Sequence, residues 1–62
     1  MMFSAGDRIR VLVDNADYAE VRKGDIFTVK DVYPDGEDDM VEVEGPEYWW
    51  FSFKNIELVE SA

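Results

Sequence analysis

The chain contains no cysteine and no histidine among its 62 residues. Without cysteine there is neither a disulfide bond nor a thiolate ligand for a structural zinc site. Without histidine the chain lacks the commonest general base and the commonest metal ligand. The acidic run Asp35–Asp39 is typical of a solvated turn, because the glutamate that a calcium-binding loop needs at its twelfth position is a proline here, Pro46. We therefore expect no enzyme activity, no cofactor and no metal site.

Basic residues are also scarce. Six lysines and arginines stand against fifteen acidic residues, for a formal net charge of −9, and Lys54 is the only base in residues 32–62. Proteins bind phosphate backbones through lysine and arginine, so we expect no direct contact with nucleic acid. The acidic surface is suited to a basic protein partner, although solubility alone also explains such a charge.

Long hydrophobic runs are missing as well. No stretch of 18 apolar residues occurs, and the segment Met1–Ala5 carries no basic residue. We accordingly expect neither a membrane span nor a signal peptide. The lack of cysteine fits a cytoplasmic protein.

Aromatic residues, in contrast, are concentrated in one place. The heptapeptide Glu47–Phe53 holds five of the nine aromatic residues in the chain. A β-strand directs successive side chains to opposite faces, so consecutive rings cannot all enter one core. A register with Phe51 inward places Trp49 on the same inner face and leaves Trp50, with Tyr48, on the outer face.

The remaining pattern predicts an all-β domain. Short runs rich in valine and isoleucine are separated by glycine, proline and aspartate. They predict strands over residues 7–13, 26–33, 40–44, 48–53 and 57–60, a loop over 14–23 with a helix over 16–22 as its alternative, and a 3₁₀ turn over 54–56. The side chains predicted to point inward are Ile9, Val11, Val13, Phe27, Val29, Val32 (after a bulge), Val41, Val43, Ile56 and Val59, whereas Glu42 and Glu44 are predicted on a solvent-exposed face.

Two segments carry a family resemblance. Val21–Val29 (VRKGDIFTV) resembles the diverging turn of SH3 domains, and Lys54–Glu60 (KNIELVE) resembles their 3₁₀ turn and closing strand. The resemblance covers residues 6–60 and implies one domain over residues 1–62, folded as a five-stranded SH3-like barrel with a 3₁₀ turn before the last strand. The chain is also similar to small acidic SH3-like proteins of bacteriophages, most of which have no assigned function, and this implies a phage protein acting in the host cytoplasm.

The resemblance does not extend to proline-peptide recognition. The first strand lacks the tyrosine motif of peptide-binding SH3 domains. Ser52 and Asn55 stand where those domains have a proline and a tyrosine of the peptide groove. We therefore do not expect proline-rich peptides as ligands.

The functional hypothesis is a non-catalytic module that binds a protein. Its candidate contact residues are the aromatic residues Trp50, Tyr48, Tyr18 and Trp49 and the acidic residues Glu42 and Glu44. Rings that only complete a small core are the structural alternative. One functional alternative is an acidic mimic of nucleic acid that inhibits a DNA- or RNA-binding protein of the host; another is self-association through an exposed strand edge.

Overall fold

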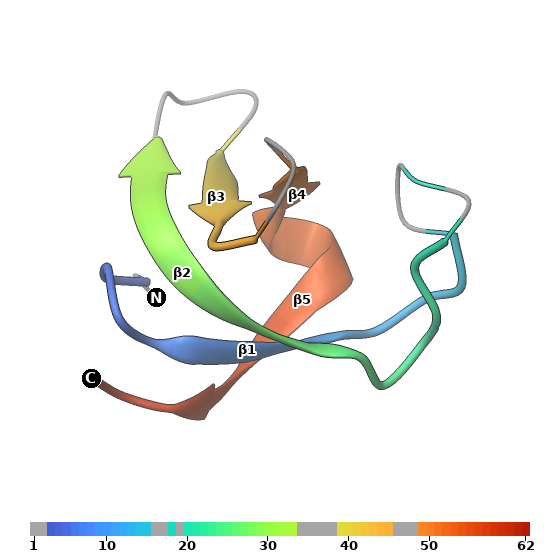
Figure 1. The fold of residues 1–62 in the computed structure, drawn as a ribbon, viewed down its shortest axis with the longest axis horizontal. Helices are drawn as coiled ribbons and strands as arrows, with labels where there is room; N and C mark the ends of the chain where they lie inside the picture. Colours follow the sequence, from blue (N-terminus) through green and yellow to red (C-terminus); the bar gives the residue numbers. More distant parts are fainter. Residues whose placement is uncertain (1–2, 16–17, 19, 34–38, 46–48) are drawn as a thin grey trace.

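The computed structural model describes residues 3–15, 18, 20–33, 39–45 and 49–62 of the chain. Within these residues there are five β-strands, one 3₁₀ turn and no α-helix (Figure 1). The elements are β1 (Arg8–Val11), β2 (Ile26–Tyr33), β3 (Met40–Val43), β4 (Trp50–Ser52), the 3₁₀ turn η1 (Phe53–Asn55) and β5 (Ile56–Glu60). The sequence prediction of an all-β fold with a 3₁₀ turn before the last strand is confirmed.

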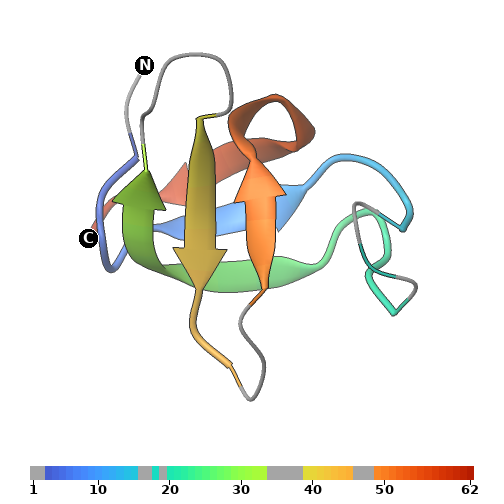
Figure 2. The same cartoon turned by 90° about the horizontal axis from the view of Figure 1, so that it is seen from above.

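The strands form one antiparallel sheet in the order β4-β3-β2-β1-β5. The long strand β2 belongs to both halves of this sheet, because its first residues pair with β1 and its last residues pair with β3. The register with β3 slips between Val29 and Asp31, as predicted ahead of Val32. Such a bulge bends a strand and increases its twist, and Figure 2 shows β2 turning from the half with β1 and β5 into the half with β3 and β4.

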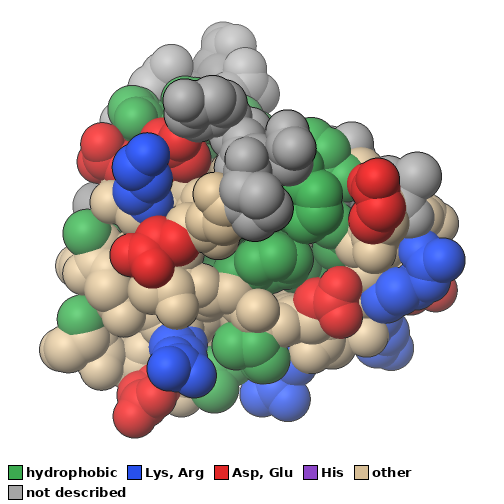
Figure 3. All heavy atoms as spheres, viewed as in Figure 1, with side chains coloured by type: hydrophobic (Ala, Val, Ile, Leu, Met, Phe, Trp, Pro, Cys, Tyr) green, Lys and Arg blue, Asp and Glu red, His purple; other side chains and the backbone are tan. Residues whose placement is uncertain are grey.

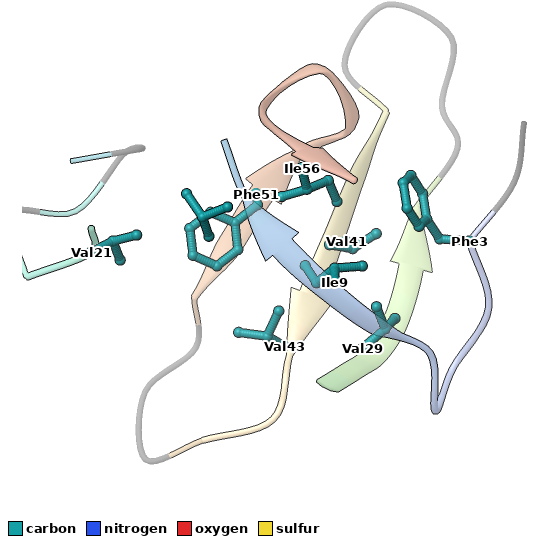
Figure 4. Packing of buried hydrophobic residues seen from close by; sticks show 9 residues of the cluster. Phe3, Ile9, Val21, Val29, Val41, Val43, Phe51 and Ile56 are labelled. Carbon is teal, nitrogen blue, oxygen red and sulfur yellow. The ribbon is translucent and has the colours of Figure 1, made fainter. Parts of the chain in front are cut away.

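The two halves enclose a single hydrophobic core. Phe51 and Val41, an opposed pair on β4 and β3, are fully buried, and Ile9 of β1 meets them from the other half (Figure 4). Phe3, which precedes the range 6–60, is also buried and places its ring edge-on to Phe53 with the centroids 4.9 Å apart. The complete buried set is Phe3, Ile9, Val11, Val21, Val29, Val41, Val43, Phe51 and Ile56.

Two predicted core positions are wrong. Val13 is 42% exposed, because β1 ends at Val11 and the chain turns at Asn15, whose φ is +57°. Val59 is 43% exposed. Leu58 packs on the core instead, as strict alternation from Ile56 requires.

The long loop after β1 is held by turns. None of its described residues is helical, and most of them lie in bends or turns, so the alternative of a helix over 16–22 has no support from them. Val21 is fully buried and anchors the loop to the core, and its carbonyl accepts the N–H of Asn15 at 2.7 Å. No helix of the described residues is long and apolar enough to cross a membrane.

A buried carboxylate joins the two ends of the described chain. Asp7 is 5% exposed, and its two oxygens accept the N–H groups of Ser4 and Ala62, each at 2.8 Å. Gly6 beside it has a φ of +94°, and a Cβ there would lie 2.9 Å from the side chain of Ala62. Glycine is therefore required at this position both for its conformation and for the close approach.

Candidate functional site: two aromatic groups around β4

The strand β4 divides the aromatic stretch between two faces. Phe51 points into the core, and Trp49, just before the strand, packs against the core from the end of the sheet. Trp50 lies opposite Glu42 on the outer face. These positions agree with the predicted register, except that Trp50 is half-buried rather than fully exposed. Tyr48, the remaining candidate of this stretch, lies outside the described residues.

Trp50 is stacked on a partner from β2. The ring of Tyr33 lies 4.7 Å from that of Trp50, centroid to centroid, at an interplanar angle of 27°. The two residues come from strands on either side of β3, so the rings meet across that strand. We call Tyr33 and Trp50 the outer aromatic pair. Tyr33 was predicted only as a residue of the strand over 26–33. The missed signal was its place two residues after Asp31, on the outer face of β2.

The outer aromatic pair covers a carboxylate. Glu42 stands between Asp31 and Trp50 in the sheet and is only 7% exposed. The prediction that Glu42 lies on a wet face is therefore wrong, and the physical reason is the pair of rings contributed by the neighbouring strands. Lys30 holds its ammonium 3.9 Å from the Glu42 carboxylate, which partly compensates the buried charge.

The phenol of Tyr33 sits between two acids. Its oxygen lies 3.2 Å from Asp31 Oδ2 and 3.3 Å from Glu42 Oε1, and its single proton is donated to one or the other. Desolvation and the neighbouring charges of Asp31 and Glu42 raise the pKa of Tyr33 above its ordinary value of 10.0. The phenol is therefore a neutral donor at physiological pH.

A second aromatic group joins the long loop after β1 to the end of the sheet. Tyr18 stacks on Trp49 with centroids 5.0 Å apart and an angle of 16°, and it meets Phe51 edge-on at 5.7 Å. Its phenol oxygen accepts the backbone N–H of Trp50 at 2.8 Å. Phe27 completes the group, 5.9 Å from Trp49 and 5.3 Å from Phe51. All of these side chains pack against the core, so Tyr18 and Trp49 have a structural role that accounts for them.

The other acidic candidates lie apart from the outer aromatic pair. Glu44 is exposed just after β3 and donates its N–H to the carbonyl of Thr28 at 2.9 Å. Asp39 is the only residue of the acidic run 35–39 within the described part of the chain. No group of three or more acidic side chains there is arranged to hold a metal ion.

Comparisons with known proteins add no identification: no protein-family model, no curated protein and no solved structure matches this chain.

Proposed function

We propose that this chain is a non-catalytic protein-interaction module with an SH3-like barrel fold, similar to the small acidic proteins of bacteriophages. The antiparallel strand order, the bend of β2 at its bulge and the 3₁₀ turn directly before β5 support that fold. The binding surface is the outer aromatic pair with the acidic residues beside it.

The observation that carries this proposal is the stacking of Tyr33 and Trp50 on the outer face. The buried core consists of seven aliphatic residues and two phenylalanines, and neither member of the pair belongs to it or packs against it. Tyr33 is 37% exposed, so part of its side chain remains accessible to a partner. Tryptophan and tyrosine are the residues most often found at energetic hot spots of protein interfaces.

The partner suited to this surface carries a basic side chain within an apolar patch. Asp31 and Glu42 beside the phenol of Tyr33 give this surface a negative charge that Lys30 only partly offsets. An arginine or lysine placed on the ring of Trp50 gains a cation–π interaction in addition to this charge. Charge complementarity of this kind mainly raises the association rate and selects among partners.

The alternative of a nucleic-acid mimic has less support. A mimic needs regularly spaced carboxylates on the surface, and Glu42, one of the acidic residues counted toward it, lies beneath the outer aromatic pair. On the face shown in Figure 3, the coloured acidic side chains are interspersed with basic and hydrophobic ones and do not form a regular row.

The test is capture of a partner on the immobilised chain, followed by calorimetry with the purified partner. Trp50→Ala should weaken binding by about 30-fold, which corresponds to a hot-spot loss of about 2 kcal/mol. Val13→Ala is the matched control, since it removes an exposed apolar side chain that follows β1 and belongs to neither the outer aromatic pair nor β5. Equal affinities of the folded wild type and folded Trp50→Ala would refute the proposal.

A further inference from the structure

A second surface lies along β5, away from the outer aromatic pair. It is an apolar groove with a volume of about 460 Å³, lined by Phe3, Phe53, Lys54, Ile56, Glu57 and Leu58. The lining includes three consecutive residues of β5, and successive side chains of a strand point to opposite faces. A groove that contacts all three must therefore follow the edge of the strand rather than one face of the sheet.

The register of β5 shows which backbone groups point to this edge. On the β1 side, Leu12 donates its N–H to the carbonyl of Asn55 at 2.9 Å, which makes these two a hydrogen-bonded pair. Hydrogen-bonded and non-hydrogen-bonded pairs alternate along an antiparallel ladder. The backbone groups of Glu57 therefore point toward β1, and those of Ile56 and Leu58 point away from it, into the groove.

These groups are available to an added strand. Among the described strands, β5 pairs only with β1. The N–H of Ile56 already bonds to the carbonyl of Phe53 in the 3₁₀ turn. Within the described residues, the carbonyl of Ile56 and both backbone groups of Leu58 have no backbone partner. The opposite edge of the sheet differs, because there the N–H of Trp50 is already bonded to the phenol of Tyr18.

The charge of the chain determines which strand can be added. A second copy would bring another formal charge of −9 to the same edge and would be repelled. Glu57 and Glu60 lie along β5, and Glu60 has no salt bridge within the described residues, whereas Glu57 pairs with Arg10 at 2.9 Å. A partner strand alternates its faces as β5 does, so its apolar residues would enter the groove beside Leu58 and its basic residues would lie beside Glu57.

We infer that the free edge of β5 is a second protein-binding site, which accepts an extended segment of a partner with alternating apolar and basic residues as an additional β-strand. Backbone hydrogen bonds to Ile56 and Leu58 provide the affinity, and the groove beside Phe3 and Phe53 selects the apolar side chains. This site is independent of the outer aromatic pair.

An alternating valine–lysine octapeptide is a suitable probe, with amide hydrogen exchange of the full chain followed by NMR. At a free peptide concentration about 100 times the Kd, exchange of the Leu58 N–H should slow by up to about 100-fold, because opening then requires release of the peptide. The same peptide methylated on every backbone nitrogen keeps its charge and side chains but has no backbone N–H to donate to the carbonyls of Ile56 and Leu58. Its affinity should be lower by about tenfold or more.

Three results would overturn the inference. The first is an N-methylated peptide that binds as tightly as the parent, which would mean that charge or apolar burial alone drives binding. The second is loss of peptide binding in Trp50→Ala, which would move the peptide to the outer aromatic pair. The third is concentration-dependent protection of Leu58 without peptide, which would make a second copy the occupant of this edge.

Discussion

Replacing Asp7 by alanine should cause one of the largest losses of stability available to a single polar substitution in this chain. The side chain accepts two backbone hydrogen bonds at 2.8 Å while only 5% of the residue is exposed. A hydrogen bond to a charged group contributes about 1.5–3 kcal/mol, and water can partly replace these two because they lie near the chain ends. We expect Asp7→Ala to lower the free energy of unfolding by about 2–4 kcal/mol.

The loss expected for Asp7→Ala is a large part of the total free energy of unfolding. At the usual stability of about 0.05–0.15 kcal/mol per residue, a domain of 62 residues has a free energy of unfolding of about 3–9 kcal/mol. Urea denaturation followed by tryptophan fluorescence measures the change. Asp7→Asn, which keeps one acceptor oxygen, should fall between wild type and Asp7→Ala.

Asp14→Ala is the matched control for Asp7→Ala. Asp14 also accepts one backbone N–H, that of Lys23 at 2.9 Å, but it does so at the exposed surface. We expect its removal to cost no more than about 1 kcal/mol. If the two alanine variants unfold at the same urea concentration, the argument that burial strengthens the hydrogen bonds of Asp7 is refuted.

Three further predictions concern the aromatic groups. Tyr18→Phe keeps the stacking but leaves the N–H of Trp50 without its acceptor, and it should cost about 1–2 kcal/mol in denaturant unfolding; no change would mean that water replaces the phenol. Trp49→Ala should destabilise more than Trp50→Ala, by about 3 against about 1 kcal/mol, because only Trp49 packs against the core; the reverse order in the same assay would contradict the division of the two rings. The raised pKa of Tyr33 means that its contribution to stability is present below pH 10 and is lost as the pH rises through the raised value. The melting temperature of the wild type should therefore fall more steeply above pH 10 than that of Tyr33→Phe. Parallel curves of melting temperature against pH for the two proteins would contradict this.

The sequence predicted strands and inward side chains correctly where the hydrophobic pattern is local. The bounds of β2 were predicted to the residue, because Ile26–Tyr33 is a continuous run of strand-forming residues between a glycine turn and a proline. Once Phe51 was placed inward, alternation alone assigned Trp49 to the inner face and Trp50 to the outer face. The same alternation, applied strictly from Ile56, would also have selected Leu58 in place of Val59.

The sequence was insufficient where burial depends on distant strands. Glu42 alternates with Val41 and Val43, which is the pattern of a solvated residue. It is buried only because the rings of Tyr33 and Trp50 stack across β3 and cover it. Phe3 lies outside any periodic segment, so its contact with Phe53 had no local signal. Asp7 was predicted only as the first residue of a strand, and its bond to Ala62 joins positions 55 residues apart.

The strand order also has a kinetic consequence. Strands β2, β3 and β4 follow one another in the chain and pair with their neighbours, whereas β1 and β5 pair across most of its length. Closing a long loop costs more entropy before any contact rewards it, so we expect the β2–β3–β4 meander to be formed in the folding transition state and the β1–β5 pairing to form afterwards. Asp7, which lies next to β1 and bonds to the residue that follows β5 by two positions, would then control how fast the protein unfolds while leaving its folding rate nearly unchanged.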